Sequence, residues 1–121
     1  MTTGWKLSES CRAELLRRLG PRYARVVADH VTLASGKAGE EGEAPHPVGR
    51  AEIIGRADDG AGVEAYVVAI DGLTDRPDGG TWHVTWSLGH EREARESNAA
   101  IAECGWTEIP ARPLELIPAK W

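Results

Sequence analysis

The sequence has no apolar run long enough to cross a membrane. Its longest apolar stretches, such as residues 66–70, have the length of a strand, whereas a membrane helix needs about 20 such residues. Nothing near the start resembles a signal peptide, because Trp5, Lys6 and Leu7 lead straight into a polar helical pattern. We therefore expect a cytoplasmic protein that makes no membrane contact.

An excess of basic charge is also missing. The chain has 14 Lys and Arg against 19 Asp and Glu, a net charge of −5 with neutral histidines. Proteins that bind a long nucleic-acid backbone usually carry a basic patch and a high pI. This balance argues against an extended nucleic-acid footprint. It leaves a small nucleotide or an RNA 3′ end as a partner, because a short anion needs only a local cluster of donors. The sequence predicts no oligomeric state.

Cysteine is scarce and unpatterned. The two cysteines, Cys11 and Cys104, form neither a CxxC pair nor a metal-ligand spacing. Both lie in helical patterns, where we expect reduced, buried thiols. Each histidine at positions 30 and 83 is followed two residues later by threonine, and this spacing supplies no zinc ligand set. We expect no metal and no cofactor.

The length of 121 residues, with 41% hydrophobic and 27% charged residues, indicates one globular domain over residues 1–121. The expected elements are a helix capped by Ser8 or Ser10 and running through Leu19, a strand over 23–33, a solvent loop over 35–47, strands over 48–57 and 63–70, a loop over 71–80, a strand over 81–88, a helix over 91–104 and a strand over 112–117. This order predicts an α+β fold, a mostly antiparallel sheet with flanking helices.

One tetrapeptide pattern, His-Val-Thr followed by an apolar residue, occurs twice, at residues 30–33 and 83–86. Residues i and i+2 of a strand point to the same face, about 6.6 Å apart. Each strand therefore presents an imidazole and a hydroxyl side by side: His30 with Thr32, and His83 with Thr85.

Strand alternation makes two further predictions around these motifs. Thr81, His83, Thr85 and Ser87 are expected to form one polar face, backed by apolar residues. Asp29 adjoins His30 in sequence, and alternation places its carboxylate on the opposite face of the strand. Any contact between Asp29 and the imidazole is therefore not expected.

The paired motif resembles the signature of the 2H phosphoesterase superfamily, two His-x-Thr/Ser-x motifs that each lie on a strand. The resemblance covers roughly residues 23–104, and the 53-residue spacing of the motifs is compact for the superfamily. It implies two lobes related by a pseudo-two-fold axis and metal-independent hydrolysis of a cyclic phosphodiester. The implied substrates are a nucleoside 2′,3′-cyclic phosphate or an RNA end that carries one. A 2′,5′-linked or ADP-ribose-derived cyclic substrate remains open.

The chemistry of the four motif residues fits that reaction. Imidazole has an unperturbed pKa near 6.5, so His30 and His83 can act as a general acid and a general base near neutral pH. The resemblance implies that they do so as a pair. Thr32 and Thr85 are then expected to donate hydrogen bonds to the non-bridging phosphate oxygens.

Two further residues are weaker candidates for substrate binding. Lys37 closely follows the first motif and is long enough to reach a phosphate, although an exposed loop lysine is the simpler interpretation. Tyr66 lies among apolar residues and is a candidate to stack on a base, although core packing is the simpler interpretation. Core packing is also expected for Trp82, Trp86 and Trp106.

Two other functions are consistent with the sequence. The first is a non-catalytic module that binds phosphate or nucleotide in the same groove. The second is a structural domain in which the repeated motif is accidental. The second alternative predicts that His30 and His83 lie far apart or on opposite faces of the sheet.

Overall fold

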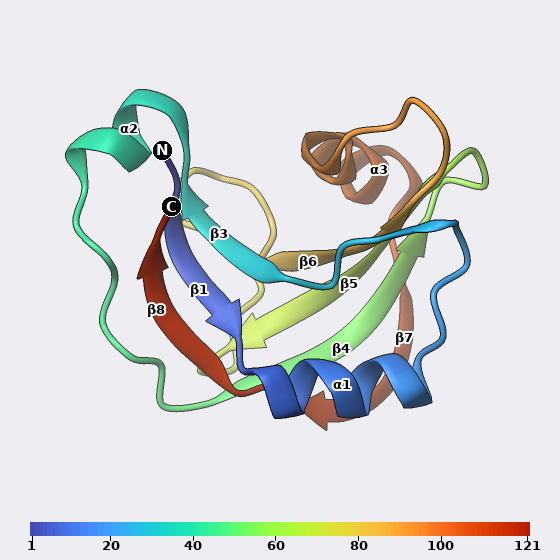
Figure 1. Cartoon of the computed structure of the whole chain (residues 1–121), viewed down its shortest axis with the longest axis horizontal. Coiled ribbons are helices and arrows are strands. Elements are labelled where there is room, and N and C mark those ends of the chain that lie inside the picture. The colour runs from blue at the N-terminus through green and yellow to red at the C-terminus, as the bar shows by residue number, and fades with distance from the viewer.

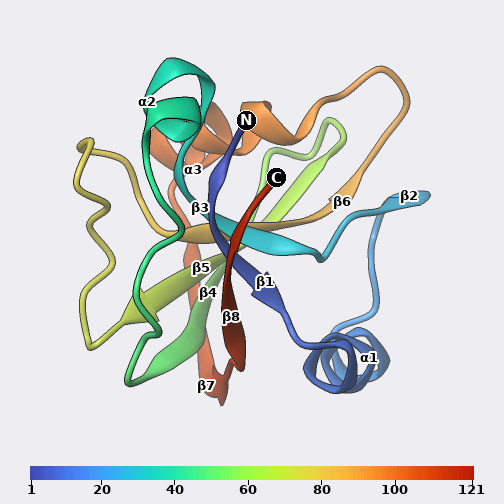
Figure 2. The same ribbon diagram turned by 60° about the vertical axis from the view of Figure 1, so that its left-hand side comes forward.

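Two antiparallel sheets and three short helices make up the computed structural model, which describes all 121 residues (Figures 1 and 2). One sheet has three strands in the order β3-β1-β8, and the other has five in the order β2-β6-β5-β4-β7. The elements are β1 (Thr3–Leu7), α1 (Glu9–Arg18), β2 (Arg25–Val26), β3 (His30–Ala34), α2 (Gly36–Glu41), β4 (Ala51–Asp58), β5 (Val63–Ile70), β6 (His83–Leu88), the 3₁₀ turn η1 (Ala94–Glu96), α3 (Ser97–Cys104), β7 (Thr107–Pro113) and β8 (Leu116–Lys120). The predicted α+β, mostly antiparallel fold is confirmed.

The first helix begins and ends where the sequence predicts. The Ser8 side chain accepts a hydrogen bond from the backbone N–H of Cys11, which caps α1. The helix ends at Leu19, just before Gly20 and Pro21. Leu15 buries its side chain in the core beneath the helix.

The prediction missed β1, the central strand of the three-stranded sheet. This strand has only five residues, and its first two, Thr3 and Gly4, are buried although neither is apolar, so too little alternation remains to predict a strand. At Gly4, a Cβ atom would collide with the carbonyl oxygen of Val31 on the neighbouring strand. Glycine therefore allows β1 and β3 to lie this close.

The segment predicted as one strand over 23–33 is two strands in two different sheets. Ala28 has a φ of 43°, and this left-handed residue breaks the extended backbone. Before the break the chain pairs with β6, and the N–H of Ala28 donates to the carbonyl of Thr85 at 2.9 Å. After the break, β3 pairs with β1. At this break the chain passes from the edge of the five-stranded sheet into the three-stranded sheet, where His30 begins β3.

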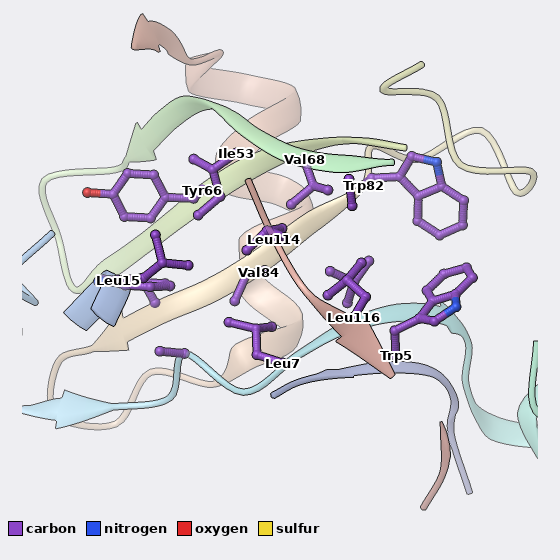
Figure 3. Close-up of a cluster of buried hydrophobic side chains, with 14 residues drawn as sticks. Trp5, Leu7, Leu15, Ile53, Tyr66, Val68, Trp82, Val84, Leu114 and Leu116 are labelled. Carbon is purple, nitrogen blue, oxygen red and sulfur yellow. The ribbon is translucent and has the colours of Figure 1, made fainter. Parts of the chain in front are cut away.

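Both sheets share one hydrophobic core (Figure 3). Trp5 of the three-stranded sheet packs edge-on against Trp82, which leads into β6, with ring centroids 5.4 Å apart. At the other end of the cluster, Tyr66 packs edge-on against Trp86 at 5.0 Å. Core packing is confirmed for Trp82 and Trp86, whereas Trp106 is 43% exposed.

The β6 strand contains a bulge that the sequence pattern does not reveal. Thr85 pairs with Ala65 and Ser87 pairs with Glu64, so Trp86 is an extra residue in β6. The Ser87 hydroxyl therefore reaches the buried Glu64 carboxylate at 2.7 Å instead of sharing a face with Thr85. The prediction of one continuous polar face through Ser87 is wrong for this reason.

The single strand predicted over 112–117 is wrong, because these residues form the end of β7 and the start of β8, which lie in different sheets. Other segments differ from prediction in length. The expected loop over 35–47 contains α2, and the expected helix over 91–104 is reduced to η1 and α3. Through Ile101, α3 packs on the face of the five-stranded sheet opposite the shared core. Both cysteines are free, but Cys104 is exposed and Cys11 is only partly buried, so neither thiol is buried as predicted. None of the helices has the length and apolar character required to cross a membrane.

Candidate functional site

A polar pocket of about 230 Å³ lies where β3 faces β6. It brings together all four residues of the paired motif, although they come from different sheets. The pocket is lined by His30, Thr32, Leu33, Ala34, Ser35, Arg76, Asp78, His83, Thr85, Ala94, Arg95 and Asn98. The accidental-motif alternative predicts separated histidines, and that prediction is wrong because both line the same pocket.

His83 is the more buried of the two histidines, with 9% of its surface exposed. Its Nδ1 atom lies 2.7 Å from the carbonyl oxygen of Thr81. A carbonyl oxygen can only accept, so Nδ1 carries the hydrogen in this contact. The neutral ring therefore has its lone pair on Nε2, which makes that nitrogen the basic atom of His83.

His30 is held by a carboxylate. Its Nδ1 lies 3.0 Å from Oδ2 of Asp29, and the same oxygen accepts a hydrogen bond from the Lys6 ammonium group at 2.5 Å. Asp29 precedes the first residue of β3 and follows the left-handed Ala28, so strand alternation does not apply to it. The prediction that Asp29 faces away from His30 is therefore wrong.

The pKa values of both histidines are lowered from the usual 6.5. Burial is the largest cause for His30, and the hydrogen bond and charge of Asp29 partly oppose it. Burial is also the largest cause for His83. The hydrogen bond to Thr81 partly opposes it, and the charges of Arg76 and His30 lower the pKa further. Only His30 has a carboxylate hydrogen-bonded to its ring, so only its protonated form gains a directly bonded anion.

The two motif threonines have different surroundings. Thr85 lies with its Oγ1 atom 3.2 Å from the carbonyl oxygen of Ala94 and 2.8 Å from the hydroxyl of the fully buried Ser97. The Thr32 hydroxyl is half-exposed at the pocket wall. Thr32 is therefore the more accessible of the two hydroxyls to a ligand.

The pocket contains two basic side chains that the sequence does not predict, Arg76 and Arg95. The Arg76 side chain lines the pocket and is only 10% exposed. Arg76 lies in a loop rich in glycine and proline, and no periodicity in such a loop predicts where a side chain points. Arg95 also lines the pocket, but its side chain is 82% exposed.

The two weaker substrate-binding candidates lie outside the pocket. Lys37 is on α2, with its side chain 87% exposed and its ammonium group 3.9 Å from Glu41. Tyr66 is 4% exposed and lies in the shared core (Figure 3), where its ring packs against that of Trp86. Neither side chain lines the pocket, because α2 leads Lys37 into solvent and the pleat turns Tyr66 inward.

The other titratable side chains form no further cluster with metal-ligand character. No group of three or more His, Cys, Asp or Glu side chains is arranged to hold a metal ion. His90 is 93% exposed and lies outside the pocket.

Comparison of the chain with models of protein families, with curated proteins and with solved structures finds no match of any of the three kinds.

Proposed function

We propose that the protein is a metal-independent phosphoesterase that hydrolyses a cyclic phosphodiester. The proposed substrates are a nucleoside 2′,3′-cyclic phosphate or an RNA end that bears one. The observation that carries the proposal is the shared pocket, which contains His30 and Thr32 from one sheet and His83 and Thr85 from the other. The resemblance of this motif pair to the 2H phosphoesterases supports it, and we propose the two-lobed, pseudo-two-fold arrangement of that superfamily.

In the proposed reaction His83 is the general base. Its Nε2 lone pair takes a proton from a water molecule, whose oxygen then attacks the phosphorus atom. The hydrogen bond from Nδ1 to the Thr81 carbonyl supports this role, because it fixes the tautomer that leaves Nε2 basic. The nearby positive charge of Arg76 also favours the neutral ring that a base requires.

His30 is the proposed general acid. Its protonated Nε2 gives a proton to the ring oxygen that leaves phosphorus, so one P–O bond forms as the other breaks. The product is a phosphate monoester with a free hydroxyl. The Asp29 carboxylate supports this role because it stabilises the imidazolium form of His30.

The threonines are proposed to bind the phosphate. Thr32 donates to a non-bridging oxygen directly. Thr85 does so when its proton leaves the Ala94 carbonyl, while Ser97 continues to donate to the Thr85 oxygen. Negative charge grows on the non-bridging oxygens in the transition state, so these bonds strengthen during the reaction.

The test is turnover of 2′,3′-cyclic nucleotides and of a short RNA with a cyclic phosphate end, with EDTA present. We expect H30A and H83A each to lower kcat/KM by at least about 10²-fold, since each removes one proton-transfer group. H90A is the matched control, because His90 is exposed and outside the pocket. Circular dichroism checks that each variant is folded.

Three results would contradict the proposal. Activity lost in EDTA and restored by a metal would contradict the metal-independent mechanism. Equal activity of H83A and wild type would show that His83 is not the general base of the reaction. Saturable nucleotide binding without turnover of any substrate would favour the non-catalytic binding module instead.

A further inference from the structure

The loop between β5 and β6 places one arginine in the proposed active site, and neither the motifs nor the resemblance assigns it a role. We propose that Arg76 is a phosphate-binding residue, held in position by Asp78, Asn98 and the absence of a side chain at Gly80. Its ligand is the phosphate group of the cyclic diester and of the monoester product. This inference rests on the proposed function and names a further residue for it.

The burial of the guanidinium group is the first observation. The Arg76 side chain is nine-tenths buried, although it belongs to a loop whose neighbouring residues are largely exposed. A buried cation is costly unless its hydrogen-bond donors are satisfied. The donors of this buried group therefore have to be accounted for one by one.

The unused donors are the second observation. Arg76 donates through Nε to Asp78 at 2.8 Å and through Nη2 to the side-chain oxygen of Asn98 at 3.0 Å. A guanidinium group has five N–H donors, so these two bonds leave three for a ligand. Planar donors of this kind match two oxygens of one phosphate.

The two partners of Arg76 fix its orientation relative to the rest of the pocket. Asn98 lies on α3, and its amide nitrogen donates to the carbonyl of Arg95 at 2.9 Å. Ala94 and Ser97, which hold Thr85, belong to the same helical segment. Arg76 is thus tied to the element that positions one of the proposed phosphate-binding hydroxyls.

Gly80 provides the space in which Arg76 folds back. A Cβ atom at position 80 would lie 2.6 Å from Nη2 and 3.1 Å from Cζ of Arg76. The N–H of Gly80 also donates to Asp78 at 2.9 Å, and the N–H of Arg76 donates to the Gly80 carbonyl at 2.9 Å. The turn is therefore built around the guanidinium group.

The Asp78 carboxylate does not cancel the attraction for an anion. Its side chain is 57% exposed, so water screens the negative charge, whereas the guanidinium charge is buried and acts through a lower dielectric. For a phosphate in the pocket, the attraction to the buried guanidinium group therefore exceeds the repulsion from the exposed Asp78 carboxylate. The Arg76 hydrogen bond lowers the pKa of Asp78, so this carboxylate is ionised at neutral pH.

The experiment measures two properties of R76A, R76K and G80A. The first is kcat/KM with 2′,3′-cyclic AMP, and the second is the affinity for inorganic phosphate, followed by NMR titration. We expect R76A to lower kcat/KM by about 10²-fold, the usual loss when one donor to a transition-state oxyanion is removed, and to abolish measurable phosphate binding. R17A is the control, because Arg17 is an exposed arginine on α1.

G80A keeps the arginine and displaces it. We expect a loss of about tenfold for G80A and for R76K, because one shifts the planar donors and the other replaces them with a single ammonium group. If R76A does not fold, the same two measurements on G80A and R76K test the role of Arg76.

The outcomes separate this inference from the proposed function. If wild type turns over substrate and H83A does not, but R76A and G80A stay within threefold of wild type in both measurements, the role of Arg76 is refuted and the phosphoesterase stands. If no substrate turns over but R76A alone loses phosphate binding, the phosphate site stands and the proposed reaction is refuted. Equal phosphate binding by R76A and R17A refutes the site in either case.

Discussion

At the scale of single residues, the proposed chemistry depends on how each histidine is held. The carbonyl of Thr81 fixes the ring of His83, and the carboxylate of Asp29 holds the ring of His30. Burial favours the neutral form of both rings, so the pKa of each lies below its usual value. Asp29 opposes this effect at His30 alone. The two rings therefore have different partners, a carboxylate for His30 and a backbone carbonyl for His83, and the proposed roles of acid and base depend on this difference.

Removing the Asp29 charge is expected to shift one side of the pH–rate profile. The Asp29 carboxylate raises the pKa of His30, so D29N lowers that pKa further and the protonated acid is lost at a lower pH. The alkaline limb of kcat/KM therefore moves to lower pH, while the acidic limb, set by His83, stays in place.

Substitution of Lys6 is expected to shift the pH–rate profile in the opposite direction. Its charge lowers the pKa of His30, so K6M is expected to move the alkaline limb to higher pH. If D29N and K6M shift the profile in the same direction, or if neither shifts it, the carboxylate does not tune His30.

At the scale of secondary-structure elements, the buried carboxylate of Glu64 on β5 connects the hairpin of β4 and β5 to β6 through the Ser87 hydroxyl. The Glu64 carboxylate is 1% exposed and receives hydrogen bonds from Arg56, from Ser87 and from the backbone of Arg22. Asp58 pairs with Arg22 and Arg56. These contacts hold the far end of β6 beyond its bulge. They therefore fix the strand that carries His83 and Thr85.

Low pH is expected to weaken the contacts of Asp58 with Arg22 and Arg56, because it protonates the Asp58 carboxylate. Burial alone would raise the pKa of Asp58, but hydrogen bonds from the Gly60 backbone, Arg22 and Tyr23 lower it from 3.8 to about 2. A carboxylate with a depressed pKa stabilises the fold above its unfolded pKa, and this stabilisation is lost as the pH falls toward 2. D58N should therefore be less stable than wild type at pH 7, and the difference should shrink from about pH 4 downward.

Urea unfolding at pH 7, 4 and 2 measures this difference. D75N is the control, because Asp75 lies in an exposed loop. A stability difference between D58N and wild type that is constant across this pH range would contradict the role given to Asp58.

At the scale of the whole molecule, the pocket exists only because the two sheets are packed together. His30 belongs to the three-stranded sheet and His83 to the five-stranded sheet, and one hydrophobic core joins the sheets. The Trp5–Trp82 contact lies in this interface. The geometry of the site is therefore a property of the packed sheets rather than of either sheet alone.

Both sheets are accordingly expected to unfold together. Urea transitions followed by tryptophan fluorescence and by far-UV circular dichroism should coincide. W82A should lower the free energy of unfolding by about 3–5 kcal/mol without separating the two transitions, since it leaves a large cavity in the shared core. Two separate transitions in the wild-type protein would show that the sheets are independent units.

The local pattern predicts some elements well and others not at all. Residues 63–70 are predicted and observed as a strand, because two turn segments flank an apolar run. The break at Ala28, the bulge at Trp86 and the fold-back of Arg76 are not predictable in this way. The first two depend on pairing with strands distant in sequence, and Arg76 folds back on Asp78, Gly80 and Asn98 in a loop that has no periodicity.

The candidate site shows the same division. Repetition of the His-x-Thr pattern was enough to select four residues that the structure brings into one pocket. Proximity in sequence and residue type suggest Lys37 and Tyr66 as candidates, but neither criterion specifies where a side chain points. The carboxylate on His30 was excluded by strand alternation, which fails where the backbone leaves the extended conformation.

The most direct test of the two-histidine mechanism is the pH dependence of kcat/KM for a 2′,3′-cyclic nucleotide, measured with EDTA for wild type, H30A and H83A. A base and an acid predict a bell-shaped profile for wild type. At their residual rates, H83A should lose the acidic limb and H30A the alkaline limb. Profiles of unchanged shape in both variants, or a variant as active as wild type, would contradict the mechanism.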